Sequence, residues 1–167
     1  VLTAEHVCYP DEIPDELNQD GVTITVTKTS NITVRSQHYS SSAKIIKKDK
    51  NLDLCILEIE EEIKVKPAKI AKKSPKRGEY VHFAGAPYGM ISESFLLTFE
   101  GTYSGDYSQA MVFSLPCAQG ASGSSIRNRK NEIVSMVQRV HPGFNHICLG
   151  VTTEELRAFL LTKHPER

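Results

Sequence analysis

Asn51-Leu52-Asp53-Leu54-Cys55-Ile56-Leu57-Glu58 places a single aspartate at the head of an apolar run. A short apolar run bounded by polar residues is typical of a buried strand. Burial of the adjoining carboxylate costs free energy unless that carboxylate accepts a hydrogen bond. The stretch therefore predicts a core strand and a polar partner for Asp53. The alternative is that Asp53 only begins the strand within a turn.

Short strand-forming runs lie on both sides of this stretch. The run Val22-Thr23-Ile24-Thr25-Val26 alternates apolar and polar residues, which indicates one buried and one exposed face. Turn residues such as His141-Pro142-Gly143 separate the runs. Many short strands at close spacing predict an all-β protein, built as an antiparallel sandwich or barrel. Further strands are predicted at residues 32–35, 43–46, 52–59, 80–84, 94–102, 110–115, 132–140 and 146–151.

One helix is predicted at the end of the chain. Thr152-Thr153-Glu154-Glu155 has the form of a capping box, in which the first threonine and the last glutamate exchange hydrogen bonds. Leu156, Phe159 and Leu160 then share one helical face. Residues 11–17 are a weaker candidate for a second, shorter helix. The charged stretch at residues 61–77, which contains two prolines, predicts a crossing between two lobes.

Charge and length exclude several classes of partner. The chain has 167 residues, and its 20 acidic and 20 basic residues cancel to a formal charge of zero. A neutral chain has no net field to steer it onto nucleic acid or an anionic membrane. No apolar run approaches the roughly 20 residues of a membrane span. The sequence contains no metal-type cysteine spacing and no nucleotide-binding loop, so we expect no metal and no cofactor.

The four cysteines are far apart in sequence. Cys55 lies within the apolar run and is interpreted as a small buried hydrophobic residue. We expect reduced thiols, which favours an intracellular or virion-associated protein over a secreted one. The other three are Cys8, Cys117 and Cys148.

Gly120-Ala121-Ser122-Gly123-Ser124 has the composition of a loop that presents a nucleophilic serine. Glycine permits the tight backbone that exposes the hydroxyl and lets a substrate carbonyl approach closely. The same turn can direct the N–H groups of Gly120 and Ser122 at one point, which would form an oxyanion hole. The alternative is a flexible loop between two strands.

Val1-Leu2-Thr3-Ala4-Glu5-His6-Val7 carries a histidine just after a predicted strand. Histidine is well suited to accept a proton near neutral pH, although a lone histidine is usually structural. Its ring N–H is also a natural partner for the Asp53 carboxylate. The order is His6, Asp53, Ser122, with separations of 47 and 69 residues. This is the order of the chymotrypsin-like catalytic triad.

With these motifs the chain resembles the trypsin-like (chymotrypsin-fold) serine proteases over essentially its whole length. It is most similar to the compact HtrA-type and viral or phage branch. Residues 78–89 resemble the opening of the second barrel in HtrA-type enzymes, and residues 132–137 resemble the strand that lines the primary specificity pocket. The resemblance implies two antiparallel β-barrels with the active site between them, followed by the C-terminal helix.

The resemblance also implies a division of the chain and a set of roles. Residues 1–66 would form the first lobe, 67–151 the second lobe, and 152–167 the helix and tail. His6 would be the general base, Asp53 would orient it, and Ser122 would be the nucleophile. Ser135 would lie near Asp53, and residues 135–137 would pair with the substrate backbone. The substrate-binding residues are expected to be Pro116, Cys117, Gln119, Ser135, Met136 and Val137, with His141 or His146 as further pocket candidates.

Four departures from the family pattern bear on these roles. His6 lies so near the first residue that the first barrel lacks its opening strands. Ala121 stands where the trypsin branch has an aspartate, which argues against zymogen-type activation. Ser124-Ser125 replaces the common Gly-Pro after the nucleophile, a change that distant members of the family tolerate. Pro116 stands where trypsin has its acidic pocket floor, so an uncharged or polar side chain is favoured at the cleavage site over Arg or Lys.

We therefore predict a serine endopeptidase that hydrolyses polypeptides through an acyl-enzyme. The second hypothesis is a catalytically inactive peptide-binding module on the same fold. A third is a protease domain cut from a viral polyprotein, which would share the chemistry. The sequence does not indicate an oligomeric state.

Overall fold

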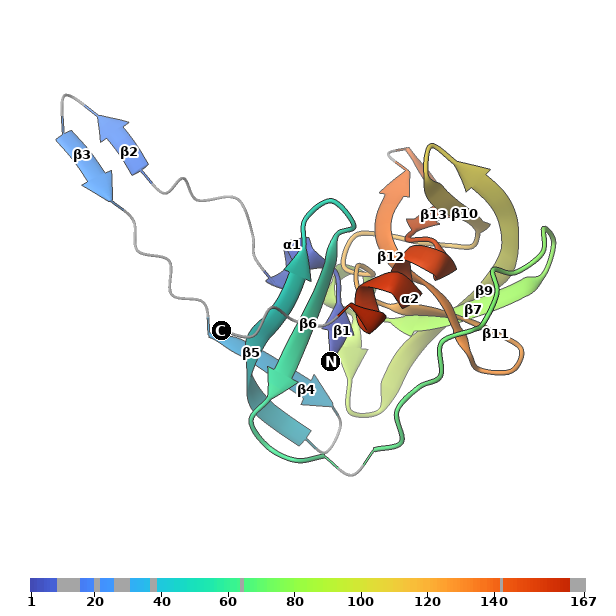
Figure 1. The fold of residues 1–167 in the computed structure, drawn as a ribbon, viewed down its shortest axis with the longest axis horizontal. Coiled ribbons are helices and arrows are strands. Elements are labelled where there is room, and N and C mark those ends of the chain that lie inside the picture. Colours follow the sequence, from blue (N-terminus) through green and yellow to red (C-terminus); the bar gives the residue numbers. More distant parts are fainter. Residues whose placement is uncertain are drawn as a thin grey trace.

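The computed structural model describes residues 1–8, 16–19, 22–25, 31–36, 39–63, 65–141 and 143–162. Most of its strands lie in two antiparallel sheets that follow one another along the chain (Figure 1). A single helix of more than one turn, α2 (Thr153–Leu161), closes the described part. The prediction of an all-β chain with a C-terminal helix is confirmed.

The first sheet contains the strand that follows Asp53. In the described residues its order is β1-β6-β5-β4, formed by β1 (Leu2–Thr3), β6 (Leu54–Ile59), β5 (Tyr39–Asp49) and β4 (Ile32–Ser36). Leu54, Cys55 and Leu57 are buried, as the apolar run predicts. No ladder joins β1 to β4 in that part of the chain, so the sheet curls without closing. This half-barrel agrees with the prediction of a first barrel without its opening strands.

A short hairpin precedes β4. It pairs β2 (Glu16–Gln19) with β3 (Val22–Thr25), which lies within the predicted strand at residues 22–26. The weaker prediction of a helix at residues 11–17 is wrong for its last two residues, because Glu16 and Leu17 belong to β2. Residues 11–15 lie outside the described residues.

The second sheet closes into a barrel. Its strands are β7 (Tyr80–Gly85), β8 (Ile91–Ser92), β9 (Phe95–Tyr107), β10 (Ala110–Ser114), β11 (Ser125–Asn128), β12 (Ile133–His141) and β13 (Phe144–Gly150). Six of them form a ring in the order β10-β13-β12-β11-β7-β9, and β9 pairs back to β10. β8 follows the 3-10 turn η1 (Pro87–Gly89) along the chain and pairs only with the first residues of β9. Phe83, Phe113 and Leu115 are among the apolar side chains that fill the barrel.

A second cluster of apolar side chains joins the two sheets and α2. Leu54 of β6 and Ala4, between β1 and α1, meet Met136 of β12 and Leu156 and Phe159 of the helix. The capping box is present, since Thr152 Oγ1 accepts a hydrogen bond from the Glu155 N–H at 3.2 Å and the Glu155 carboxylate accepts one from Thr152 N. Leu160, predicted on the same face, is 38% exposed. The helix is therefore anchored through Leu156 and Phe159.

The stretch at residues 61–77 runs from the first sheet to the second. Lys69 and Ala71 exchange backbone hydrogen bonds with Ile133 at 2.8 Å, so this stretch lies along the start of β12. The proposed boundaries at residues 66/67 and 151/152 stay predictions. No helix in the described part of the chain is both long and apolar enough to cross a membrane.

The cysteines require a correction. All four form disulfides, Cys8 with Cys55 and Cys117 with Cys148, whereas reduced thiols were expected. The interpretation of Cys55 as a small hydrophobic residue was right about its burial and wrong about its chemistry. The partners are 47 and 31 residues apart, and only the folded chain brings their Cα atoms within 6.7 and 5.5 Å.

Candidate active site

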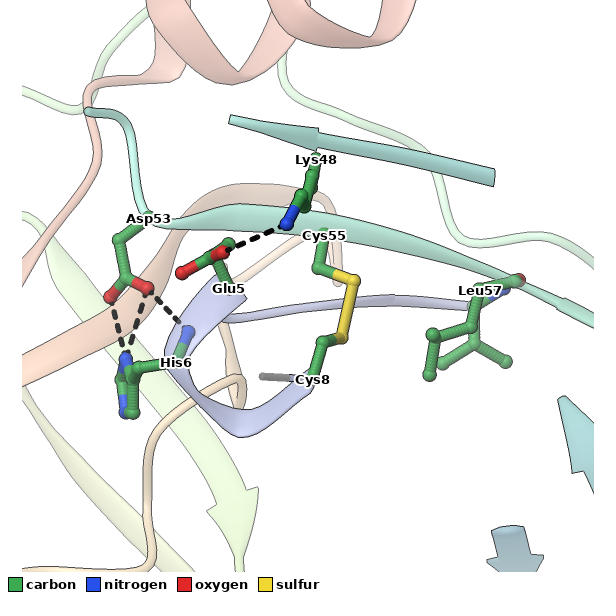
Figure 2. The surroundings of a disulfide bond; sticks show 8 residues. Glu5, His6, Cys8, Lys48, Asp53, Cys55 and Leu57 are labelled. Carbon is green, nitrogen blue, oxygen red and sulfur yellow. Dashed lines mark hydrogen bonds and ion pairs between the residues drawn. A yellow bond between two sulfur atoms is a disulfide. The ribbon is translucent and has the colours of Figure 1, made fainter. Parts of the chain in front are cut away.

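His6 and Asp53 are in direct contact. His6 lies on α1 (Glu5–Cys8), a single helical turn, and its Nδ1 is 2.9 Å from both carboxylate oxygens of Asp53. The backbone N–H of His6 also donates to Asp53 Oδ1 at 3.0 Å (Figure 2). A carboxylate at Nδ1 leaves Nε2 as the ring nitrogen able to accept a proton. The pair therefore has the arrangement of a base held by its orienting residue.

The turn before β6 fixes the direction of the Asp53 side chain. Its backbone has φ of 49°, in the left-handed region that aspartate and asparagine tolerate better than other side chains. The side chain of His6 is 48% exposed and that of Asp53 22% exposed. Water therefore reaches the imidazole, and the ion pair that it could form contributes little to stability.

The backbone of the Ser122 loop leaves two N–H groups free. The N–H groups of Ala121, Gly123 and Ser124 donate to the carbonyls of Ala118, Val137 and Ala121. In the described part of the chain neither Gly120 nor Ser122 donates its N–H to any acceptor. Two unpaired N–H groups, two residues apart at a tight turn, can bind a developing oxyanion.

Gly120 has a conformation and a packing that exclude other residues. Its φ is +90°, and a Cβ there would lie 2.9 Å from the N atom of Tyr88. The N–H of Tyr88 donates to the carbonyl of Gln119 at 2.7 Å. The turn at residues 86–89 thus supports the backbone that carries the Gly120 N–H.

Two contacts bring the Ser122 loop to the first sheet. A Cβ on Gly123 would lie 2.2 Å from Thr3 Oγ1 and 3.2 Å from the N atom of Ala4, just before His6. On the other side, Gln138 Nε2 donates to the carbonyl of Leu52, next to Asp53. Ser122 is therefore held beside the segments that carry His6 and Asp53.

The hydroxyl of Ser122 is directed at β12. It donates to the carbonyl of Gln138 at 3.4 Å, and among the described residues no hydrogen bond joins it to His6. Such bonds are often long or absent without substrate and tighten in the complex.

The residues expected to bind substrate differ in accessibility. Gln119 is exposed and Pro116 half-buried, while Cys117 is buried in its disulfide with Cys148. His141 and His146 are exposed on the β12–β13 hairpin.

Ser135, Met136 and Val137 are at most 1% exposed, inside β12. β11 pairs with Ser135 and Met136, and β13 pairs with Val137. The hydroxyl of Ser135 donates to the carbonyl of Val151 at 2.6 Å, and no described contact links it to Asp53. The residue of β12 that faces Ser122 is Gln138, which the sequence interpretation missed. A single glutamine in an apolar run carries no signal that would have identified it.

Two surface hollows are present, and the second borders the Ser122 loop at Gly123. One, of about 800 Å³, is lined by Lys72, Lys76, Arg129 and neighbouring residues, and the other, of about 490 Å³, by Leu2, Ile70, Met136 and neighbours. Neither is lined by His6, Asp53 or Ser122. No group of three or more His, Cys, Asp or Glu side chains that could hold a metal ion occurs among the described residues.

Comparison with known proteins identifies a family. A family model described as the trypsin-like peptidase domain matches residues 1–136. No curated protein matches the chain.

Among the solved structures with a similar fold are bacterial proteases. The active form of the Rv3671c protease of M. tuberculosis is similar with a TM-score of 0.75 and 16% identity, covering 99% of this chain and 69% of that one. The inactive form of the same protease has a TM-score of 0.71 and 16% identity, and the match covers 95% of this chain and 74% of that one. The serine endoprotease of Yersinia pestis has a TM-score of 0.72 and 18% identity. That match covers 95% of this chain and 51% of the other. At these identities the likeness establishes the chymotrypsin-like fold alone.

Proposed function

The chain belongs to the trypsin-like peptidase domain family, and from this premise we propose that it is a serine endopeptidase with Ser122 as nucleophile, His6 as general base and Asp53 as the orienting residue. The observation that carries the proposal is the contact of His6 Nδ1 with both oxygens of Asp53 at 2.9 Å. It leaves Nε2 available for the proton of an attacking hydroxyl.

The proposed reaction is acyl transfer in two steps. Ser122 Oγ attacks the peptide carbonyl while His6 Nε2 takes its proton, and the negative charge develops on the carbonyl oxygen. The unpaired N–H groups of Gly120 and Ser122 would stabilise that oxyanion. His6 then gives the proton to the leaving amine, and water hydrolyses the acyl-enzyme by the same route. Asp53 stays ionised and keeps the Nδ1 proton in place.

Two features support an enzyme that needs no zymogen cleavage and lacks Arg or Lys specificity. Ala121 is fully buried and has no carboxylate to pair with a new N-terminus, as in the HtrA-type and viral branches. Pro116 offers no charge to a basic side chain. We propose that Gln119 and the backbone at Gln138, the part of β12 beside Ser122, contact the substrate.

A serine-reactive fluorophosphonate probe tests the nucleophile. We expect the probe to label wild-type protein and Ser124→Ala, and not Ser122→Ala. Ser124 is the matched control, because it lies in the same loop and its N–H pairs within the loop, with Ala121. Peptide hydrolysis should fall by roughly 10⁴-fold or more in Ser122→Ala. Labelling that persists in Ser122→Ala would remove Ser122 from the nucleophile role.

Peptide binding without labelling or turnover in the wild type would favour the inactive module.

A further inference from the structure

We propose that the Cys8–Cys55 disulfide is a positioning element of the active site, which keeps the imidazole of His6 against the carboxylate of Asp53. The proposal rests on the proposed function, because it concerns the same histidine and aspartate. It goes further by assigning a catalytic consequence to a bond that touches neither substrate nor reacting atoms.

The disulfide and the His6–Asp53 contact join the same two segments of the chain. Cys8 follows His6 by two residues and Cys55 follows Asp53 by two, so both links span 47 residues. Figure 2 shows them side by side, with the carboxylate at one end of the α1 turn and the sulfur bridge at the other. One link is covalent and buried, while the other is polar and partly exposed.

The α1 turn cannot hold this geometry alone. It has four residues, and the N–H of Val7 donates to the carbonyl of Ala4 at 3.3 Å. A single isolated helical turn is unstable in water, because fixing its backbone costs more than one hydrogen bond returns. The turn must therefore be fastened from outside.

In the described part of the chain, two further contacts hold the start of the turn. Ala4 is buried in the cluster between the sheets, and the Glu5 carboxylate lies 3.9 Å from Lys48 Nζ. Beyond His6, Val7 is 53% exposed and Cys8 is 2% exposed, bonded to Cys55 and packed in the apolar cluster of the first sheet. Among the described residues the disulfide is the covalent link at the end of the turn after His6, and without it that end would be held by side-chain packing at position 8 and by the exposed His6–Asp53 contact.

A loose end would affect the reaction more than the fold. Catalysis by a general base requires its nitrogen within hydrogen-bond reach of the nucleophile. A displacement of about 1 Å at such a group can lower the rate by about 10²-fold. We therefore expect Cys8→Ala with Cys55→Val to lower kcat by about 10²-fold, with KM nearly unchanged.

The kinetic test is a double-mutant cycle with His6→Ala. If the disulfide acts through His6, its removal has no further effect on the residual rate of His6→Ala. A loss of the same size in both backgrounds would mean a general loss of structure and would overturn the proposal. Thr152→Ala, which removes the N-cap of α2, is the control for lowered stability. It should lower the melting temperature and leave kcat unchanged.

A structural measurement decides the proposal independently of activity. The backbone N–H of His6 is bonded to Asp53, so its hydrogen exchange, followed by NMR, reports that contact. We expect exchange to be about tenfold or more faster in Cys8→Ala/Cys55→Val, and unchanged in Cys117→Ala/Cys148→Val. Unchanged exchange in the first variant, or equal acceleration in both, would overturn the proposal. If the wild-type protein fails to react with the fluorophosphonate, the proposed function is wrong, and the exchange result still decides whether the disulfide positions His6.

Discussion

At the level of single residues, Asp53 combines two requirements that few side chains meet. Its backbone adopts φ of 49° at the end of the turn from Lys50 to Asp53, and its carboxylate contacts both the backbone and the ring of His6. Aspartate and asparagine are the side chains most often found in this region of the backbone, and only aspartate carries the charge. The residue type is thus explained by the fold and by the site together.

Tyr103 gives the chain a dependence of stability on alkaline pH. The side chain is 6% exposed, and its hydroxyl donates to Asp106 Oδ1 at 2.7 Å. Burial first, and then this hydrogen bond, raise the pKa of Tyr103 to about 12. The unfolded chain releases the same proton near pH ~10. The contribution to stability is therefore complete below pH ~10 and is lost as the pH rises to about 12.

We expect the free energy of unfolding to fall more steeply in the wild type than in Tyr103→Phe over that interval. Urea unfolding at about pH 9 and about pH 11 measures the difference. Tyr107→Phe is the control, because Tyr107 is 72% exposed. Equal pH dependence in wild type and Tyr103→Phe would contradict the prediction.

At the level of elements, a lysine from the first sheet caps the last helix. Lys47 Nζ donates to the carbonyl of Thr162 at 2.7 Å and to its hydroxyl at 2.6 Å, and also to the carbonyl of Phe159. It lies 4.5 Å from the centre of the Phe159 ring. The final carbonyls of a helix lack partners within it, and a cation there is favoured by the helix dipole. β5 therefore fixes the C-terminal end of α2.

Lys47→Met keeps most of the unbranched side chain and removes its donors. We expect the free energy of unfolding to fall by about 1–3 kcal/mol, measured by urea unfolding. Lys44→Met is the matched control, because Lys44 is on the same strand and its exposed side chain pairs with Glu60. Its effect should stay within about 0.5 kcal/mol. A Lys47→Met effect no larger than the control would mean that the cap contributes nothing.

A β-bulge explains why Gln138 faces the Ser122 loop. The register of β12 with β13 shifts between Val137 and Arg139. Bulges of this kind redirect side chains and leave a backbone group unpaired. Here the backbone carbonyl of Gln138 accepts a hydrogen bond from the Ser122 hydroxyl, and the side-chain amide of Gln138 donates one to the carbonyl of Leu52. An irregularity in one strand thus links the loop of the second barrel to the first sheet.

At the level of the whole molecule, the position of Gly123 decides how closely the two lobes approach. Gly78 has the same φ of +83°, and nothing lies within 4 Å of the Cβ that an alanine would add there. Gly123 has that φ and a clash at 2.2 Å with Thr3. The two glycines therefore separate the cost of the backbone conformation from the cost of the contact between lobes.

We expect Gly78→Ala to lower the free energy of unfolding by about 1–2 kcal/mol and to keep its activity. Gly123→Ala should lose more stability and most of its peptidase activity, because the added methyl group pushes Ser122 away from the His6 segment. Urea unfolding and kcat/KM for a peptide measure both. Equal activity in the two variants would argue against a close fit between the lobes at Gly123.

Much of the architecture could be predicted from the chain because its signals are local. The apolar run after Asp53 forms β6, and the capping box lies at the start of α2. The closely spaced runs form the strands of an all-β fold. The contact of His6 with Asp53 was anticipated from order, spacing and resemblance to a family.

The sequence by itself therefore determined the strands and the helix, because each depends on neighbours along the chain, and it predicted the residues of the proposed site. The disulfides depend on which Cα atoms the fold brings together, whereas the apolar run around Cys55 and the lack of close-spaced cysteine pairs pointed to reduced thiols. The place of Gln138 depends on a bulge, whose register is set by the partner strand. These features arise from contacts between distant segments, so only the tertiary structure decided them.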